Sequence, residues 1–142
     1  MEPKQSRVKR KEPESLRLRG AQAGYTVNDI EKSLAWYRDV LGFTVGEQMR
    51  DGGALMGVEL KAGNVSIWLG QDDWKKGKDR SKGEGVRLYF EASQPVDDIA
   101  RLVKERGGKL DHEPQTQPWG TRDFGITDPD GFKITIQNLK KA

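Results

Sequence analysis

Residues 119–131 read Trp-Gly-Thr-Arg-Asp-Phe-Gly-Ile-Thr-Asp-Pro-Asp-Gly, and this stretch decides the fold. Its last four residues, Asp128 to Gly131, are typical of a tight turn, because Pro sets φ, Asp side chains bind nearby amides and Gly accepts a positive φ. Phe132, Ile134 and Ile136 then alternate with polar residues, as in a strand with one buried face. The stretch therefore predicts two antiparallel strands joined by a turn, with a Trp beside them.

The composition predicts one folded domain of ordinary size. A chain of 142 residues can bury a core without cross-links, and the sequence contains no Cys. Disulfides, thiolate nucleophiles and Cys-based metal sites are therefore excluded. Because no apolar run approaches about 20 residues and no apolar signal segment begins the chain, we expect a cytoplasmic protein that does not contact the membrane.

The basic character of the chain belongs to its N-terminal end. Residues 1–19 hold seven basic and three acidic side chains and so carry +4, which leaves −1 for the remainder of a chain of net charge +3. Segments rich in charge, Pro and Ser are usually disordered, so we expect a disordered basic tail over residues 1–17. The body lacks nucleic-acid-binding motifs, and a nucleic-acid partner is therefore not expected.

Two parts of the chain share one order of expected elements: a strand, a helix and three strands. Strands are expected near residues 18–27, 43–50, 54–61 and 65–69, and again near 86–92, 109–113, 122–127 and 132–138. Helices are expected over 29–41, capped by Asn28 with Glu31, and over 96–106, with Ile99, Leu102 and Val103 on the buried face. The repeat predicts an α+β fold of two βαβββ modules.

The domain boundaries follow from this repeat. The first module is expected over residues 18–70 and the second over 86–142, with one folded domain covering 18–139. Residues 71–85, rich in Lys, Asp and Gly, are expected to form an exposed polar linker. Residues 115–118 are expected to be irregular.

One face of each sheet is left without a helix, and we expect this open face to carry the function. Strand alternation places Trp68 on the open face of the first module and Arg87, Tyr89 and Glu91 on that of the second. If the sheets curl, these polar and aromatic groups would line a small-molecule cleft. The alternative is a solvated outer face.

Residues 27–43, Val-Asn-Asp-Ile-Glu-Lys-Ser-Leu-Ala-Trp-Tyr-Arg-Asp-Val-Leu-Gly-Phe, resemble the first helix and its exit in the vicinal oxygen chelate superfamily. This superfamily includes glyoxalase I, bleomycin-resistance proteins and extradiol dioxygenases. Residues 128–131 resemble its last turn, and the resemblance covers about residues 18–139. It implies the glyoxalase-like fold, in which curled mixed sheets form a cleft, a homodimer and, in many members, a divalent metal.

The resemblance assigns the metal-ligand positions to Gln22, Trp68, Arg87 and Thr135. Gln22 offers a weak amide ligand, Trp68 and Thr135 offer nothing useful, and Arg87 is a permanent cation that repels a metal. The single His, His112, is expected to lie off this set. We therefore expect no metal and no cofactor, and neither glyoxalase nor dioxygenase activity.

Residues 118–124, followed by the turn at 128–131, most resemble the bleomycin-resistance branch. Such proteins bind a drug without a protein-held metal and sequester it in two clefts formed across a dimer. Those that bind cationic drugs tend to be acidic, whereas this body is nearly neutral and has Arg87 in the expected cleft. This departure favours a neutral, aromatic or anionic ligand over bleomycin.

The candidate ligand-binding residues come from both modules. Trp68 and Trp119 are expected to stack on a flat ligand, unless Trp119 caps the core. Arg87 is expected to pair with an anionic ligand group, or else with Glu91 or Asp123. The full set is Gln22, Trp68, Arg87, Tyr89, Glu91, Trp119, Asp123 and Thr135.

Three functions remain open. The first is a metal-free binding protein that holds a small, partly aromatic molecule, as in antibiotic resistance. The second is an enzyme of the same superfamily, of lyase, isomerase, hydrolase or dioxygenase type, which uses Arg87 with Glu91 or Asp123 in place of a metal. Spacing alone assigns no catalytic residue. The third is a structural or regulatory dimer without a small ligand.

Overall fold

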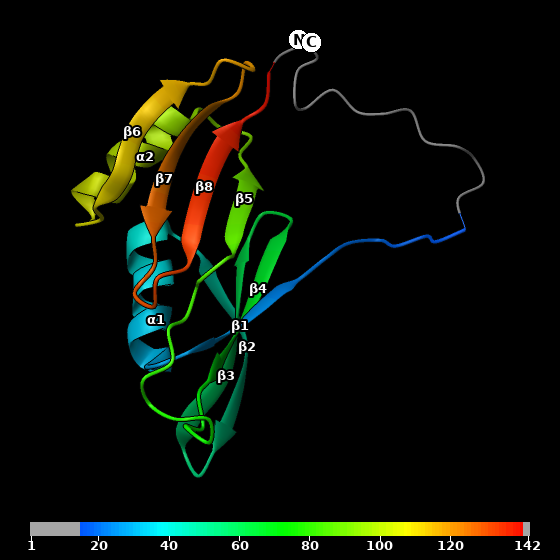
Figure 1. Cartoon of the computed structure of the whole chain (residues 1–142), viewed down its shortest axis with the longest axis vertical. Helices are drawn as coiled ribbons and strands as arrows, with labels where there is room; N and C mark the ends of the chain where they lie inside the picture. Colours follow the sequence, from blue (N-terminus) through cyan, green and yellow to red (C-terminus); the bar gives the residue numbers. More distant parts are fainter. Residues whose placement is uncertain (1–14, 141–142) are drawn as a thin grey trace.

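The computed structural model describes residues 15–140 and shows two four-stranded sheets with their helices (Figure 1). The first module contains β1 (Ala23–Val27), α1 (Ile30–Trp36), a π-helical turn η1 (Tyr37–Leu41), β2 (Thr44–Asp51), β3 (Ala54–Ala62) and β4 (Val65–Gln71). The second contains β5 (Arg87–Glu91), α2 (Val96–Glu105), β6 (Leu110–Thr116), β7 (Arg122–Thr127) and β8 (Lys133–Asn138). The predicted α+β order of two βαβββ modules is confirmed. Residues 1–14, most of the expected tail, lie outside the described residues.

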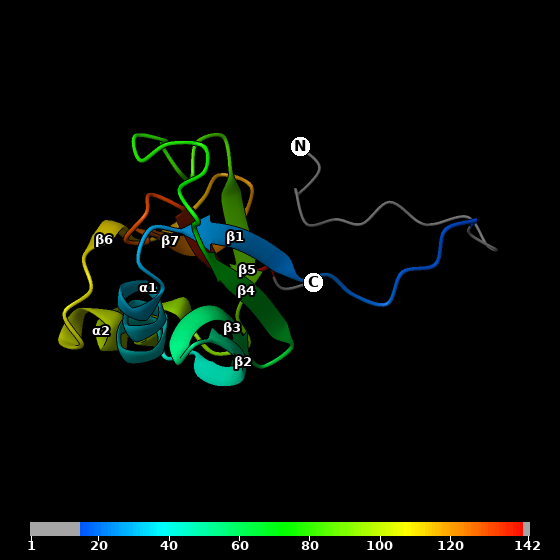
Figure 2. The same cartoon turned by 90° about the horizontal axis from the view of Figure 1, so that it is seen from below.

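Each module forms its own mixed sheet. The strand orders are β1-β4-β3-β2 and β5-β8-β7-β6, with β1 parallel to β4 and β5 parallel to β8. The other neighbours are antiparallel. Figure 2 shows α1 and α2 on the same side of the molecule, which leaves one face of each sheet open. None of the helices within residues 15–140 is long and apolar enough to cross a membrane.

A single hydrophobic core draws on both modules. Its fully buried members include Val27 and Leu60 of the first module and Val103 of the second. Aromatic contacts cross between the modules: the rings of Tyr25 and Phe132 stack with centroids 4.1 Å apart, and those of Phe43 and Phe90 lie 6.1 Å apart. The modules therefore fold as one unit.

The turn at residues 128–131 fastens the second module to the first. The Tyr37 hydroxyl donates to Oδ2 of Asp128 at 2.7 Å, and the backbone amides of Asp130 and Phe132 donate to Oδ1 at 2.9 and 2.8 Å. The hydroxyls of Tyr25 and Tyr37 lie 2.7 Å apart. Burial raises the pKa of the Asp128 carboxyl and the pKa of both phenols, because each charged form loses solvation.

The start of α1 takes part in the same joint. The predicted cap at Asn28 is wrong: Asp29 is the N-cap, and its side chain accepts from the Lys32 amide at 3.2 Å. Asn28 instead donates its backbone N–H to Oδ2 of Asp130 at 3.0 Å. The residue expected to cap the helix therefore binds the other module.

The linker contains a buried ion pair as well as exposed residues. Most of it is exposed, but Asp72 is buried and accepts from Lys82 at 2.8 Å and from Arg80 at 3.1 Å. The Lys82 side chain is 6% exposed, and its ammonium lies 5.1 Å from the centroid of the Trp74 ring. The hydrogen bond from Lys82 is the main reason that the pKa of Asp72 lies far below its usual range. We call this group, Asp72 with Trp74, Arg80 and Lys82, the linker clasp.

The end of the linker packs closely against the β7–β8 turn. Gly83 has a φ of +77°, and a Cβ there would stand 2.4 Å from the carbonyl oxygen of Gly131. Only glycine fits this conformation and this separation without displacing the turn.

Three local expectations are wrong. Leu102 is 38% exposed, and Val96, Ala100 and Val103 form the buried stripe of α2 instead. Val86, expected in a strand, precedes β5 and is 46% exposed.

The third concerns residues 115 and 116, part of the segment 115–118 expected to be irregular; residues 117 and 118 do lie outside the strands. β6 continues to Thr116, which pairs with Arg122, while Gln115 pairs with Asp123. Pro114 is tolerated because β6 is an edge strand with an irregular register.

Replacing Tyr37 by Phe is predicted to destabilise the fold. The change removes the hydroxyl that donates to Asp128 and leaves a buried carboxylate oxygen without this donor. The free energy of unfolding, measured by urea denaturation, should fall by about 1–3 kcal/mol. Tyr25→Phe is the matched control, because it removes a neighbouring hydroxyl but keeps the bond from Tyr37 to Asp128. An equal or larger loss in the control would contradict this role for Asp128.

Candidate functional site

The open faces of the two sheets hold most of the predicted ligand-binding residues. Ile67, Leu69, Ile134 and Ile136 are buried on the helix side, so their neighbours along β4 and β8 point the other way. The open face of the first sheet carries Gln22 and Trp68, and that of the second carries Arg87, Tyr89, Glu91, Asp123 and Thr135.

Trp68 forms a flat platform on the first sheet. Its ring lies directly over Gly57, where an added Cβ would stand 2.3 Å from Cζ2 of the indole. Gly24 pairs with Trp68 in the β1–β4 ladder, and Gly70 follows two residues later on the same face. Gly57 is the glycine that the indole requires, and the ring is half-buried, so part of it remains exposed for stacking on a flat molecule.

A small polar cluster lies beside this platform. Ser66 Oγ donates to Oε2 of Glu59 at 3.0 Å, and Gln22 Nε2 donates to Ser66 Oγ at 2.7 Å. Glu59 also lies directly opposite Trp68 in the β3–β4 ladder. The cluster therefore places an oxygen-rich edge next to the indole.

On the second sheet, Arg87 and Thr135 come together. Arg87 Nη1 donates to Thr135 Oγ1 at 3.0 Å, so the expected pairing of Arg87 with Glu91 or Asp123 is not what the structure shows. Thr135 is buried, whereas Arg87 is exposed. Lys133 stands directly opposite Arg87 in the β5–β8 ladder.

Asp123 belongs to a different cluster. Its buried carboxylate accepts from Gln117 Nε2 at 2.9 Å, and His112 Nε2 lies 3.7 Å from the same oxygen. His112 Nδ1 lies 2.9 Å from the carbonyl oxygen of Glu113, which orients the ring. Gly125 makes room for the imidazole, because a Cβ there would lie 3.1 Å from His112 Cδ2.

The remaining predicted residues lie at the margins. Tyr89 is 54% exposed and pairs with Thr135, while Glu91 is exposed and pairs with Gln137. Trp119 lies in the turn before β7, and its indole Nε1 is buried. Trp119 is half-buried, and both stacking on a ligand and capping of the core remain predictions.

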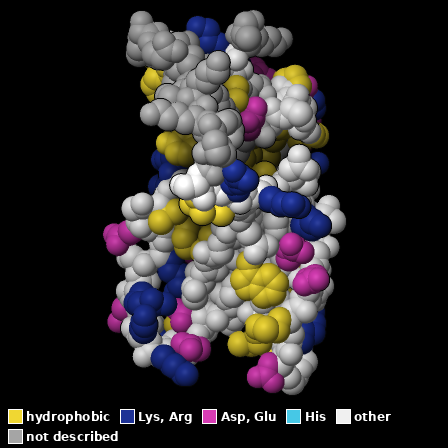
Figure 3. All heavy atoms as spheres, turned by 90° about the vertical axis from the view of Figure 1, so that its right-hand side faces the viewer, with side chains coloured by type: hydrophobic (Ala, Val, Ile, Leu, Met, Phe, Trp, Pro, Cys, Tyr) yellow, Lys and Arg dark blue, Asp and Glu magenta, His cyan; other side chains and the backbone are white. Residues whose placement is uncertain are grey.

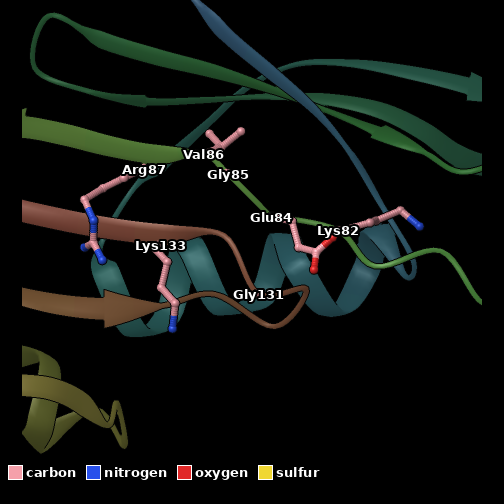
Figure 4. Close-up of a pocket in the computed structure, with 8 residues that line it drawn as sticks. Lys82, Glu84, Gly85, Val86, Arg87, Gly131 and Lys133 are labelled. Carbon is pink, nitrogen blue, oxygen red and sulfur yellow. The ribbon is translucent and has the colours of Figure 1, made fainter.

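A cavity of about 420 Å³ lies where the linker meets the second sheet (Figure 4). It is lined by Lys82, Gly83, Glu84, Gly85, Val86, Arg87, Gly131 and Lys133. Arg87 is the one predicted ligand-binding residue among them. The cavity is therefore distinct from the Trp68 platform. Figure 3 shows a further face of the molecule, where hydrophobic side chains lie in separate groups among charged ones.

The residues at the superfamily's metal positions do not suit a divalent ion. Arg87 and Thr135, at two of the positions that the resemblance assigns to metal ligands, are hydrogen-bonded to each other, and Arg87 is a permanent cation. Trp68 has no ligand atom, and Gln22 donates its amide N–H to Ser66. Within residues 15–140, no three His, Cys, Asp or Glu side chains gather in a way that would hold a metal.

Several polar neighbours of the site were missed in the sequence. Strand alternation places Lys133 on the open face together with Thr135, although Lys133 is not in the predicted ligand-binding set, and the structure puts it opposite Arg87. Glu59, Gln117 and His112 lack such a signal. The approach of His112 to Asp123 depends on the irregular register between β6 and β7, which spacing along the chain does not reveal.

The comparisons with known proteins agree with this architecture. Residues 20–136 match the family model of the Glyoxalase/Bleomycin resistance protein/Dioxygenase superfamily. Bleomycin resistance proteins of Geobacillus stearothermophilus and Staphylococcus aureus are 28% identical over 128 residues, covering 80% of this chain and 92% of theirs.

Solved structures show the same fold. A glyoxalase/bleomycin resistance protein/dioxygenase from Nocardioides has a TM-score of 0.69 at 19% identity, covering 92% of this chain and 89% of its own. TioX from Micromonospora sp. ML1 has a TM-score of 0.69 at 17% identity, covering 83% of this chain and 96% of its own. With its doubled βαβββ architecture and a family match over most of its length, the chain belongs to the glyoxalase/bleomycin resistance protein/dioxygenase superfamily.

Proposed function

We propose that this protein binds and sequesters a small, flat molecule without the help of a metal. The observation that carries the proposal is the Trp68 platform, where the half-buried indole lies on Gly57. Aromatic stacking of this kind contributes about 0.5–1.5 kcal/mol beyond the burial of apolar area. A side chain at Gly57 would displace the ring from this position.

The class of ligand follows from the charge of the open faces and from the relatives. The relatives named bleomycin resistance proteins support an antibiotic or a comparable aromatic metabolite as the ligand. Arg87 on the second sheet disfavours a cationic drug and favours a neutral or anionic one. The eight residues proposed from the sequence stay a prediction for the contact set, with Trp68 and Arg87 as its principal members.

A homodimer would complete the site. The two sheets are separate ladders, and the open face of each offers one wall. Met49, Val86 and Tyr89 are 54%, 46% and 54% exposed, which provides apolar surface for a second copy. We propose that the wall of one copy faces the wall of the other, and that the dimer resides in the cytoplasm.

Trp68→Ala is predicted to weaken ligand binding by tenfold or more, since it removes the platform. Gly57→Ala should weaken binding as well, because its Cβ would displace the ring. Binding is measured by quenching of tryptophan fluorescence with a panel of planar antibiotics and aromatic metabolites. Trp74→Phe, in the linker, is the matched control and should bind as the parent protein does. If no compound quenches the parent protein, or if Trp74→Phe impairs binding equally, the proposal fails.

Purified protein is predicted to contain no stoichiometric divalent ion and to sediment as a dimer. Elemental analysis after purification without chelators checks the first expectation, and analytical ultracentrifugation checks the second. A metal bound with Gln22, Glu59 or His112 as ligand would overturn the metal-free assignment. A monomer that retains full ligand affinity would overturn the shared cleft.

A second candidate is an acid–base enzyme of the same superfamily. The observation that favours it is the orientation of His112, with Nδ1 at the Glu113 carbonyl and Nε2 towards the buried Asp123. His112→Gln would then abolish turnover of a bound compound while leaving its affinity unchanged, with Lys109→Gln as a surface control. Ligands that bind and are recovered unchanged from both the parent protein and the variant would exclude this candidate.

A further inference from the structure

The cavity between the linker and the second sheet has a chemistry of its own. Its walls are the end of the linker, the start of β5, the β7–β8 turn and the start of β8. Arg87 and Lys133 extend to the same side of these strands in Figure 4, while Val86 points the opposite way. The cavity is therefore lined on one side by two basic residues.

The two cations are placed side by side by the strand register. Arg87 is directly opposite Lys133 in the parallel β5–β8 ladder, and both are exposed. Like charges directly opposite each other destabilise a sheet. The pair thus costs stability, which calls for a compensating negative charge.

The described part of the chain supplies no carboxylate to either cation. Arg87 donates to the hydroxyl of Thr135 at 3.0 Å, and Lys133 donates to the hydroxyl of Thr127 at 3.1 Å. Within residues 15–140 neither forms an ion pair, although Asp111 accepts from Thr127 at 2.7 Å and so lies one hydroxyl away from Lys133. Their hydroxyl partners hold both side chains in place without neutralising them.

Two other charged residues line the cavity, Lys82 and Glu84, and the carboxylate of Glu84 offsets one of the two free positive charges. Lys82 is neutralised by Asp72 in the linker clasp. Glu84 lines the cavity, but it forms no ion pair with the described residues. Arg87 uses Nη1 for Thr135, so Nε and Nη2 remain for a ligand. Such a guanidinium edge binds two oxygens of one phosphate or carboxylate.

One of the three glycines that line the cavity, Gly85, leaves its backbone accessible. Gly83, Gly85 and Gly131 form part of the wall, and a Cβ at Gly85 would meet no atom within 4 Å. An anion can therefore approach the backbone of Gly85 closely.

We propose that this cavity is an oxyanion site, in which Arg87 and Lys133 together bind a phosphate or carboxylate group. The inference rests on the proposed function only in assigning that group to the captured small molecule. Arg87 grips two oxygens, and Lys133 adds a point charge that compensates a second negative charge. The site accordingly favours doubly charged phosphate over a carboxylate.

Inorganic phosphate and acetate, each titrated into the full chain, test the site. Amide chemical shifts recorded by NMR should move in a saturable way at Gly83, Gly85 and the start of β8. Arg87→Gln is expected to weaken phosphate binding about tenfold or more and Lys133→Gln several-fold, because each removes a charge-assisted hydrogen bond. Lys109→Gln removes one exposed positive charge outside the cavity and should leave the affinity unchanged. Thermal denaturation confirms that each variant is folded.

The outcomes separate this site from the proposed function. Saturable binding of phosphate that is tighter than that of acetate and is weakened in Arg87→Gln and Lys133→Gln supports the site. Tighter binding of acetate contradicts the preference for phosphate. Binding of neither anion, or an equal loss in Lys109→Gln, overturns it. Trp68→Ala should retain phosphate binding, so phosphate binding without any aromatic ligand would leave the oxyanion site standing and remove the sequestration proposal.

Discussion

The buried carboxylate of Asp128 is the interaction on which the arrangement of the molecule depends. A charge taken out of water is costly unless donors surround it, and here a phenol from one module and two amides of its own turn provide them. The phenol belongs to Tyr37, at the start of the π-helical turn, and its ring is fully buried. The relative position of the two sheets, and with it that of both open faces, follows from this joint.

The two faces of each sheet carry different kinds of side chain. Both helices lie on one side of the molecule, and the apolar side chains of the strands are buried there in a single core. Chemistry is confined to the open faces, and these differ: the first carries an indole among glycines, the second two cations at one end and the carboxylates Glu91 and Asp123 at the other. On the second sheet a guanidinium, hydrogen-bonded to Thr135, stands at a position that the superfamily resemblance assigns to a metal ligand.

The strand pattern predicted the architecture because alternation depends only on residues that are close in the sequence. The repeated order of elements then predicted two similar modules. Alternation with a period of two assigned Trp68, Arg87 and Thr135 to the open faces, and all eight strands lie close to where the pattern placed them. The errors come from contacts that join distant parts of the chain. Asn28 has the chemistry of a cap, but the turn of the other module binds it, and Asp29 caps the helix instead.

Distance along the chain also explains what was missed in the site. The proximity of His112 to Asp123 depends on bulges that no spacing rule locates, and the burial of Lys82 depends on a carboxylate ten residues earlier. A run of Lys, Asp and Gly indicates solvent exposure on average, and the average holds for most of the linker. The exception is the ion pair of Asp72 and Lys82, whose side chains are buried.

The linker clasp has a consequence for how this chain can change in length. Asp72 and Lys82 meet at 2.8 Å, so residues 73–81 leave the body and return to nearly the same point. The distance between the two modules therefore depends on the contact of Asp72 with Lys82 and not on the length of residues 73–81. Because closing a longer loop adds only about 0.6 kcal/mol for each doubling of its length, extra residues inserted near Gly77 would extend outwards while the two sheets keep their places. The fold thus contains a built-in point of insertion, at which a chain of this architecture can acquire new sequence without rebuilding its core.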